Sequence, residues 1–161
     1  MIAGIDPGKH GALFLLGPPH GYATVPLVKI DNKDKPDYDA WWRIWYPLLL
    51  DAEHIMIEFA AARPGQGVTS MFSFGYCAGF IRGLVLSTGR PHTLIPPQMW
   101  KKLAGLRGSN KDESRCRASQ LVPEAVDFWL RKKDDGIAEA ALIALSYRLM
   151  ESRILRNGEL I

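Results

Sequence analysis

Residues 2–16 of the chain read IAGIDPGKHGALFLL. Two short apolar runs, residues 2–6 and 11–16, stand on either side of an Asp-Pro-Gly segment, and this pattern predicts two buried strands joined by a tight turn. A third apolar run, residues 22–29, follows soon after Gly17-Pro18-Pro19. Connections as short as these predict an antiparallel meander of three strands.

Helices and further strands alternate along the rest of the chain. The spacing of apolar residues predicts helices after Pro36 and over residues 68–87, 98–103, 110–122 and 135–153, and strands over residues 54–59 and 92–95. Pro47 is expected to kink or end the first of these helices. No linker, repeat or change of composition divides the chain, so we predict a single α/β domain over residues 1–161.

Large aromatic side chains recur at helical spacing in the first helix. They are Tyr38, Trp41, Trp42 and Trp45. Such a stripe could stack on nucleic-acid bases, but at this spacing we expect it to pack in the core.

Three glycines at positions 75, 79 and 83 form a smooth ridge on the long helix predicted over residues 68–87. Glycine inside a helix costs about 1 kcal/mol relative to alanine, so three in register imply a compensating close contact. Either the sheet or a second subunit could supply the partner.

The composition is that of a globular protein. Hydrophobic residues make up 47% of the 161 residues, enough for a sizeable core, and charged residues make up 23%, which argues against intrinsic disorder. The longest apolar stretch, residues 71–86, contains Arg82 and three glycines and is too short to cross a bilayer, so no membrane partner is expected. The chain start does not resemble a signal peptide, and two cysteines give no disulfide framework, so we expect a cytoplasmic protein.

Basic residues are concentrated in one third of the chain. Residues 101–133 contain nine lysines and arginines against four aspartates and glutamates. A local excess of positive charge is typical of a surface that binds a polyanion, although a solvated basic face would look the same.

Four carboxylates stand at positions where acids are poorly tolerated. Asp6 and Glu58 end apolar strands, and Asp135 and Glu139 share one face of an otherwise apolar helix. Burying an unpaired carboxylate costs several kcal/mol, and no arginine lies beside these residues in sequence.

A bound divalent cation would neutralise several of these acids at once. Carboxylate ligands without a cluster of His and Cys favour magnesium or manganese over zinc. Each acid also has a structural interpretation: Asp6 could form a turn, Glu58 could be an ion-pair partner, and Asp135 could cap a helix. Taken together, the four favour a metal site.

Four segments in chain order carry a resemblance to a known family. They are GIDPGKHGALFLL (residues 4–16), IEFAAA (57–62), GSNKDESRCRASQLVP (108–123) and DDGIAEAALIAL (134–145). They resemble, respectively, the first hairpin, the strand with the catalytic glutamate, the basic segment and the acidic C-terminal helix of RuvC-type Holliday junction resolvases, and of phage-encoded members in particular. The resemblance implies an RNase H-like α/β fold, in which helices flank a five-stranded mixed sheet of three antiparallel strands followed by two parallel ones.

The resemblance also implies a catalytic site with two Mg²⁺ ions, for which Mn²⁺ could substitute. By position, Asp6 would bridge the two ions and Glu58 would complete one of them. Asp135 and Glu139 would be the ligands from the helix.

This chain departs from the family pattern within the acidic helix. The family usually has an acid or a histidine three residues before the final acid, where this chain has Gly136. Asp135 is the expected substitute, and Asp134 competes for the role.

The implied substrate is a four-way DNA junction, which a homodimer would nick on opposite strands to leave 5′-phosphates. In this family the long helix after the glutamate strand helps to form the dimer, which agrees with the glycine ridge. Lys111 would contact a phosphate near the site. The other residues expected to bind DNA are Arg63, Lys101, Lys102, Arg107 and Arg115.

Three other functions stay open. The segment from Asp6 to Gly11 also resembles the first phosphate loop of sugar kinases and actin-like ATPases, but those proteins need two such domains. An RNase H-like nuclease could instead cut forks, flaps or structured RNA. A non-catalytic junction-binding module is a third alternative, and four intact acids argue against it.

Overall fold

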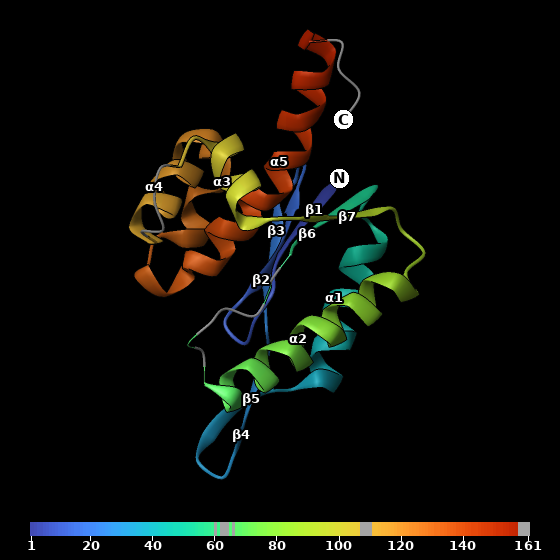
Figure 1. Cartoon of the computed structure of the whole chain (residues 1–161), viewed down its shortest axis with the longest axis vertical. Helices are drawn as coiled ribbons and strands as arrows, with labels where there is room; N and C mark the ends of the chain where they lie inside the picture. Colours follow the sequence, from blue (N-terminus) through green and yellow to red (C-terminus); the bar gives the residue numbers. More distant parts are fainter. Residues whose placement is uncertain (60, 62–64, 66, 107–110, 158–161) are drawn as a thin grey trace.

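A mixed β-sheet forms the centre of the protein (Figure 1). The computed structural model describes residues 1–59, 61, 65, 67–106 and 111–157, and of residues 111, 156 and 157 only the backbone. Within these residues, the central sheet has five strands in the order β3-β2-β1-β6-β7. Their bounds are Ile2–Asp6 (β1), Ala12–Leu16 (β2), Gly21–Thr24 (β3), His54–Glu58 (β6) and His92–Ile95 (β7). The first three strands pair antiparallel, and β6 and β7 run parallel to β1, which confirms the predicted mixed sheet.

Helices cover both faces of this sheet (Figure 1). The α-helices are α1 (Tyr38–Leu50), α2 (Val68–Ser87), α3 (Pro97–Ala104), α4 (Lys111–Leu121) and α5 (Asp135–Asn157), with two 3₁₀ helices over Pro123–Trp129 and Lys132–Asp134. Because side chains alternate along a strand, Ile2 of β1 packs in the core under α5, whereas Ala3 and Ile5 pack in the core under α1 and α2.

The aromatic stripe of α1 packs mainly in the core. Trp41 and Trp45 are fully buried, as expected, whereas Trp42 is half exposed. Pro47 was expected to kink or end the helix. It does not end it, because α1 continues to Leu50. Pro47 has no N–H to donate to the carbonyl of Arg43, so α1 lacks one of its hydrogen bonds there and still continues for three residues.

A second, two-stranded sheet was not expected. The predicted strand over residues 22–29 is in fact two strands, because β3 ends at Thr24 and β4 (Leu27–Ile30) begins after Pro26, which cannot donate a ladder hydrogen bond. β4 pairs with β5 (Lys33–Pro36) through a two-residue turn, in which Asp31 and Asn32 have φ of 51° and 58°. Two consecutive left-handed residues are the mark of a type I′ hairpin turn.

The glycine ridge of α2 faces away from the sheet. The buried residues of α2 are Cys77, Ile81, Leu84 and Val85, and they lie in the core cluster shared with α1 and the sheet. A Cβ atom added at Gly75, Gly79 or Gly83 would meet nothing within 4 Å among the described residues. Of the two partners considered for the ridge, the sheet is therefore excluded.

Helix α2 is also longer than the apolar stretch considered from the sequence. With 20 residues it is, among the described residues, the one helix long and apolar enough to cross a membrane by length and composition. The expectation that its length excludes a membrane span is therefore wrong. Its packing against the sheet through Cys77 and Ile81 gives part of this apolar composition a structural role.

Candidate active site

The carboxylates of Asp6 and Glu58 stand at the same edge of the central sheet. They end the adjacent parallel strands β1 and β6, whose register pairs Ile5 with Ile57 immediately before them. Alternation along each strand places both on the face covered by α5, because Ile2 and Met56 pack in the core on that face. The fold thus brings together two acids that are 52 residues apart in sequence.

The first turns of α5 lie over this edge. A Cβ added at Gly136 would lie 3.4 Å from Oδ2 of Asp6 and 2.7 Å from the carbonyl oxygen of His10. The position at which the family usually has an acid or a histidine therefore faces Asp6 closely, and only glycine fits there without displacing its neighbours. Asp135 precedes Gly136, and Glu139 follows it by less than one turn.

Two side chains that the sequence pattern did not single out hold these carboxylates. The indole Nε1 of Trp100 in α3 donates to Oε2 of Glu58 at 2.8 Å. The hydroxyl of Ser114 in α4 donates to Oε1 of Glu139 at 3.2 Å. Two helices thus orient the acids, and no sequence signal marks Trp100 or Ser114 for this role.

The side chains of the four acids do not form a closed metal site in their present positions. Within the described residues, no three His, Cys, Asp or Glu side chains are grouped closely enough to hold a metal ion. Their chemistry nevertheless fits a hard cation, since Asp6, Glu58, Asp135 and Glu139 offer carboxylate oxygens and all four are only partly buried.

The two aspartates before Gly136 have different surroundings. Asp134 is 9% exposed and accepts hydrogen bonds from Arg131, at 2.8 Å from Nε and 3.0 Å from Nη2. These bonds hold the pKa of Asp134 below its usual value. Asp135 is partly exposed and accepts a hydrogen bond from the backbone N–H of Gly136. Asp134 thus has a structural role, and Asp135 is the more accessible of the two.

A groove lies between the loop that follows Asp6 and the segment that precedes Asp135. It has a volume of about 350 Å³ and is lined by residues of the β1–β2 loop, the β3–β4 connection and the segment before α5. Its charged lining residues are Lys9, Arg131, Lys133 and Asp134. Cations therefore border the edge at which the acids lie.

The structure describes the side chains of three of the expected DNA-binding residues, Lys101, Lys102 and Arg115. Lys101 and Lys102 lie in the last turn of α3, and the ammonium of Lys101 lies 5.3 Å from the ring centre of Trp100. Arg115 forms an ion pair with Asp112 and donates to the carbonyl of Leu130, so the protein's own contacts engage it.

The remaining expected DNA-binding residues lie outside what the structure describes. Arg63 and Arg107 are not among the described residues, and of Lys111 only the backbone, at the start of α4, is described. Their predicted contacts with DNA stay predictions.

Comparison with known proteins gives a structural likeness. No protein-family model matches the sequence, and no curated protein matches it. The Thermus thermophilus RuvC structure aligns over 94% of this chain and 95% of RuvC, with a TM-score of 0.54 and 18% identity. RuvC from T. thermophilus in complex with a Holliday junction substrate aligns over the same shares, with a TM-score of 0.58 and 13% identity. The fold is that of RuvC. At such low identity, the likeness shows the fold alone.

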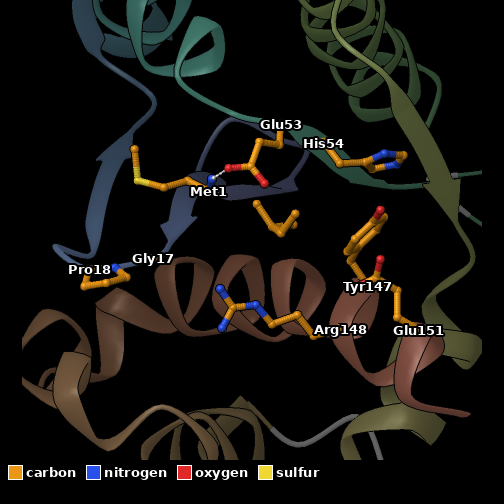
Figure 2. A pocket seen from close by; sticks show the side chains of 9 residues that line it. Met1, Gly17, Pro18, Glu53, His54, Tyr147, Arg148 and Glu151 are labelled. Atoms are coloured by element: carbon orange, nitrogen blue, oxygen red, sulfur yellow. Dashed lines mark hydrogen bonds and ion pairs between the residues drawn. The ribbon is translucent and has the colours of Figure 1, made fainter. Parts of the chain in front are cut away.

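Another cavity lies at the opposite end of this RuvC-like sheet (Figure 2). It has a volume of about 410 Å³, and its lining includes Met1, His54, Tyr147, Arg148 and Glu151. His54 starts the strand that Glu58 ends, so this cavity is separated from the acids by the length of β6. Burial lowers the pKa of His54 and raises that of Tyr147.

Proposed function

We propose that this protein is a metal-dependent endonuclease that resolves four-way DNA junctions by paired nicking of opposite strands, leaving 5′-phosphates. The observation that carries the proposal is the position of Asp6 and Glu58 at adjacent parallel strand ends, on the face covered by the acidic start of α5. The RuvC-like fold supports it, because one of the similar structures is a complex with a Holliday junction substrate.

In this proposal the chain's own residues position the scissile phosphodiester. Asp6, Glu58, Asp135 and Glu139 would hold two Mg²⁺ ions, with Mn²⁺ able to substitute. The bound ions would supply activation of a water molecule and stabilisation of the leaving 3′ oxygen. Trp100 and Ser114 would orient Glu58 and Glu139, and the cations near the groove would hold the DNA backbone.

The direct test is a cleavage assay with Mg²⁺ or Mn²⁺ on a mobile four-way junction, a fork, a flap and a structured RNA. We expect symmetric paired cuts in the junction and ligatable 5′-phosphate ends. Preferential cutting of forks, flaps or RNA would favour the other nuclease activities. Junction binding without cleavage in either metal would favour a binding module.

We also propose that the active form is a homodimer whose interface includes the glycine ridge of α2. An exposed ridge flanked by exposed apolar side chains, such as Phe72 at 75% and Tyr76 at 58%, supports this assignment. Paired incision of opposite strands needs two sites related by a two-fold axis, which an isologous interface provides. Cytoplasmic location and phage origin stay predictions.

Gly79→Leu is expected to turn the dimer into a monomer. The new side chain would meet nothing within 4 Å of its Cβ among the described residues, so the fold should survive, while close approach of a second copy is blocked. Light scattering gives the mass, and circular dichroism gives the fold. A folded variant that stays dimeric would show that the ridge is not the interface.

Asp134→Asn and Asp135→Asn are expected to have opposite effects. Asp134→Asn removes the charged partner of Arg131, whose side chain is largely exposed, and should lower the free energy of unfolding by about 1 kcal/mol at neutral pH while cleavage continues. Because folding lowers the pKa of Asp134, its stabilisation is present at neutral pH and is lost as the pH falls through the folded-state pKa. The stability difference should therefore shrink in acid.

Asp135→Asn should keep the stability and lose most of the cleavage. Urea denaturation at neutral and acidic pH, together with junction cleavage rates, separates the two variants. An inactive Asp134→Asn beside an active Asp135→Asn would reverse the assignment.

A further inference from the structure

The β4–β5 hairpin projects from the body of the protein (Figure 1). All of β4 is exposed, and so is all of β5 except Pro36. A hydrogen bond from the N–H of Asp37 to the carbonyl of Pro26, at 2.9 Å, closes the base of the hairpin. The two-residue type I′ turn sets the register of the hairpin and so decides which side chains share a face.

The register separates the hairpin's side chains into two unlike faces. Val28 opposes Lys35 and Ile30 opposes Lys33, so that one face carries two lysines and two aliphatic side chains and no acid. On the other face Lys29 opposes Asp34. We call the face formed by Val28, Ile30, Lys33 and Lys35 the lysine face.

The lysines of this face lack acidic partners in the described part of the chain. No ion pair there involves Lys33 or Lys35, and Val28 and Ile30 remain 39% and 44% exposed. Two cations beside a modest apolar surface match a polyanion better than they match a neutral protein surface.

The groove between the β1–β2 loop and the segment before α5 reaches the base of this hairpin. Leu27, the first residue of β4, lines the groove together with Lys9, His10 and Lys133, and it lies on the face of the hairpin opposite the lysine face. The carbonyl oxygen of His10 lies against Gly136 at the start of α5, which in turn faces Asp6. The acids, the groove and the hairpin are therefore connected through a chain of neighbouring residues.

We infer that the lysine face of the β4–β5 hairpin is a second DNA contact, which binds the phosphate backbone of a duplex arm beyond the cutting site. The inference rests on the proposed function. Lys33 and Lys35 stand two residues apart on β5 and project from the same face, so both can contact the backbone of one duplex. Lysines contact phosphates without reading bases, so this contact adds affinity and orientation and no sequence preference.

The test is junction binding by Lys33→Ala/Lys35→Ala across a series of salt concentrations, measured by fluorescence anisotropy. Loss of two phosphate contacts should lower the slope of log affinity against log salt by about two and weaken binding about tenfold at low salt. Lys33→Arg/Lys35→Arg should bind as the parent does. The matched control is Lys29→Ala, which removes one charge from the opposite face and should change affinity less than about threefold.

Two results would overturn the inference while the proposed function stands. One is a parent that cuts junctions, together with a double variant of unchanged affinity and slope. The other is that Lys29→Ala lowers junction affinity as much as Lys33→Ala alone does. That result would show that binding depends on the net charge of the hairpin and not on which face carries the lysine. A parent that neither binds nor cuts branched DNA would instead overturn the proposed function, and the hairpin contact with it.

Discussion

Asp6→Asn and Glu58→Gln are each expected to slow junction cleavage at least a hundredfold while leaving junction binding intact. Both acids end adjacent parallel strands on the α5 face, where they are proposed to hold the catalytic ions. Stabilisation of the transition state by bound metal is worth several kcal/mol, and each 1.36 kcal/mol is tenfold in rate. Single-turnover cleavage with saturating enzyme measures the chemical step, and anisotropy without metal measures binding.

The amide variants keep the shape of the side chains and should keep the fold. Glutamine at position 58 retains an oxygen that can accept from Nε1 of Trp100. The control is Asp39→Asn on α1, an exposed acid paired with Arg43 on the far side of the sheet from α5, which should cut at the parental rate. Parental cleavage by Asp6→Asn or Glu58→Gln would refute the two-metal mechanism.

The sequence predicted the position of these acids because it depends on short-range patterns. Asp6 and Glu58 each end a short apolar run, and the ends of parallel neighbouring strands meet at one edge of a sheet. Asp135 and Glu139 share a helix face through their spacing alone. The central sheet and helix α5 could be predicted for the same reason.

Contacts between distant segments could not be predicted. Trp100 reaches Glu58 across 42 residues and Ser114 reaches Glu139 across 25, and neither separation leaves a periodic signal in the chain. The ion pair of Arg131 with Asp134, which separates the roles of the two adjacent aspartates, likewise depends on how the segment before α5 folds.

The β4–β5 hairpin escapes prediction for a different reason. Residues 22–29 alternate enough to look like one strand, although Pro26 interrupts it. Aspartate and asparagine tolerate a left-handed backbone, so the pair Asp31-Asn32 is a sequence feature that indicates a tight turn here. The hairpin buries almost nothing, and a hydrophobic pattern therefore says little about it.

Gly4→Ala is expected to destabilise the protein by about 3 kcal/mol, because α5 packs directly on the backbone of β1 at this residue. A Cβ at Gly4 would overlap the carbonyl oxygen of Ala140 and the backbone nitrogen of Ala144, and would lie 2.8 Å from the Cβ of Ala144. These are mostly backbone atoms of a helix, so relief requires α5 as a whole to move away from the sheet. That movement would also separate Glu139 from Asp6, and cleavage should fall together with stability.

The matched control for Gly4→Ala is Gly21→Ala in β3 of the same sheet. Its added Cβ would meet only Cδ1 of Leu15, at an ordinary contact distance of 3.9 Å, so the free energy of unfolding should change by less than about 1 kcal/mol. Urea denaturation of both variants measures the difference. Equal stability of the two would mean that α5 does not approach β1 as closely as described, and the proposed grouping of Glu139 with Asp6 would lose its structural basis.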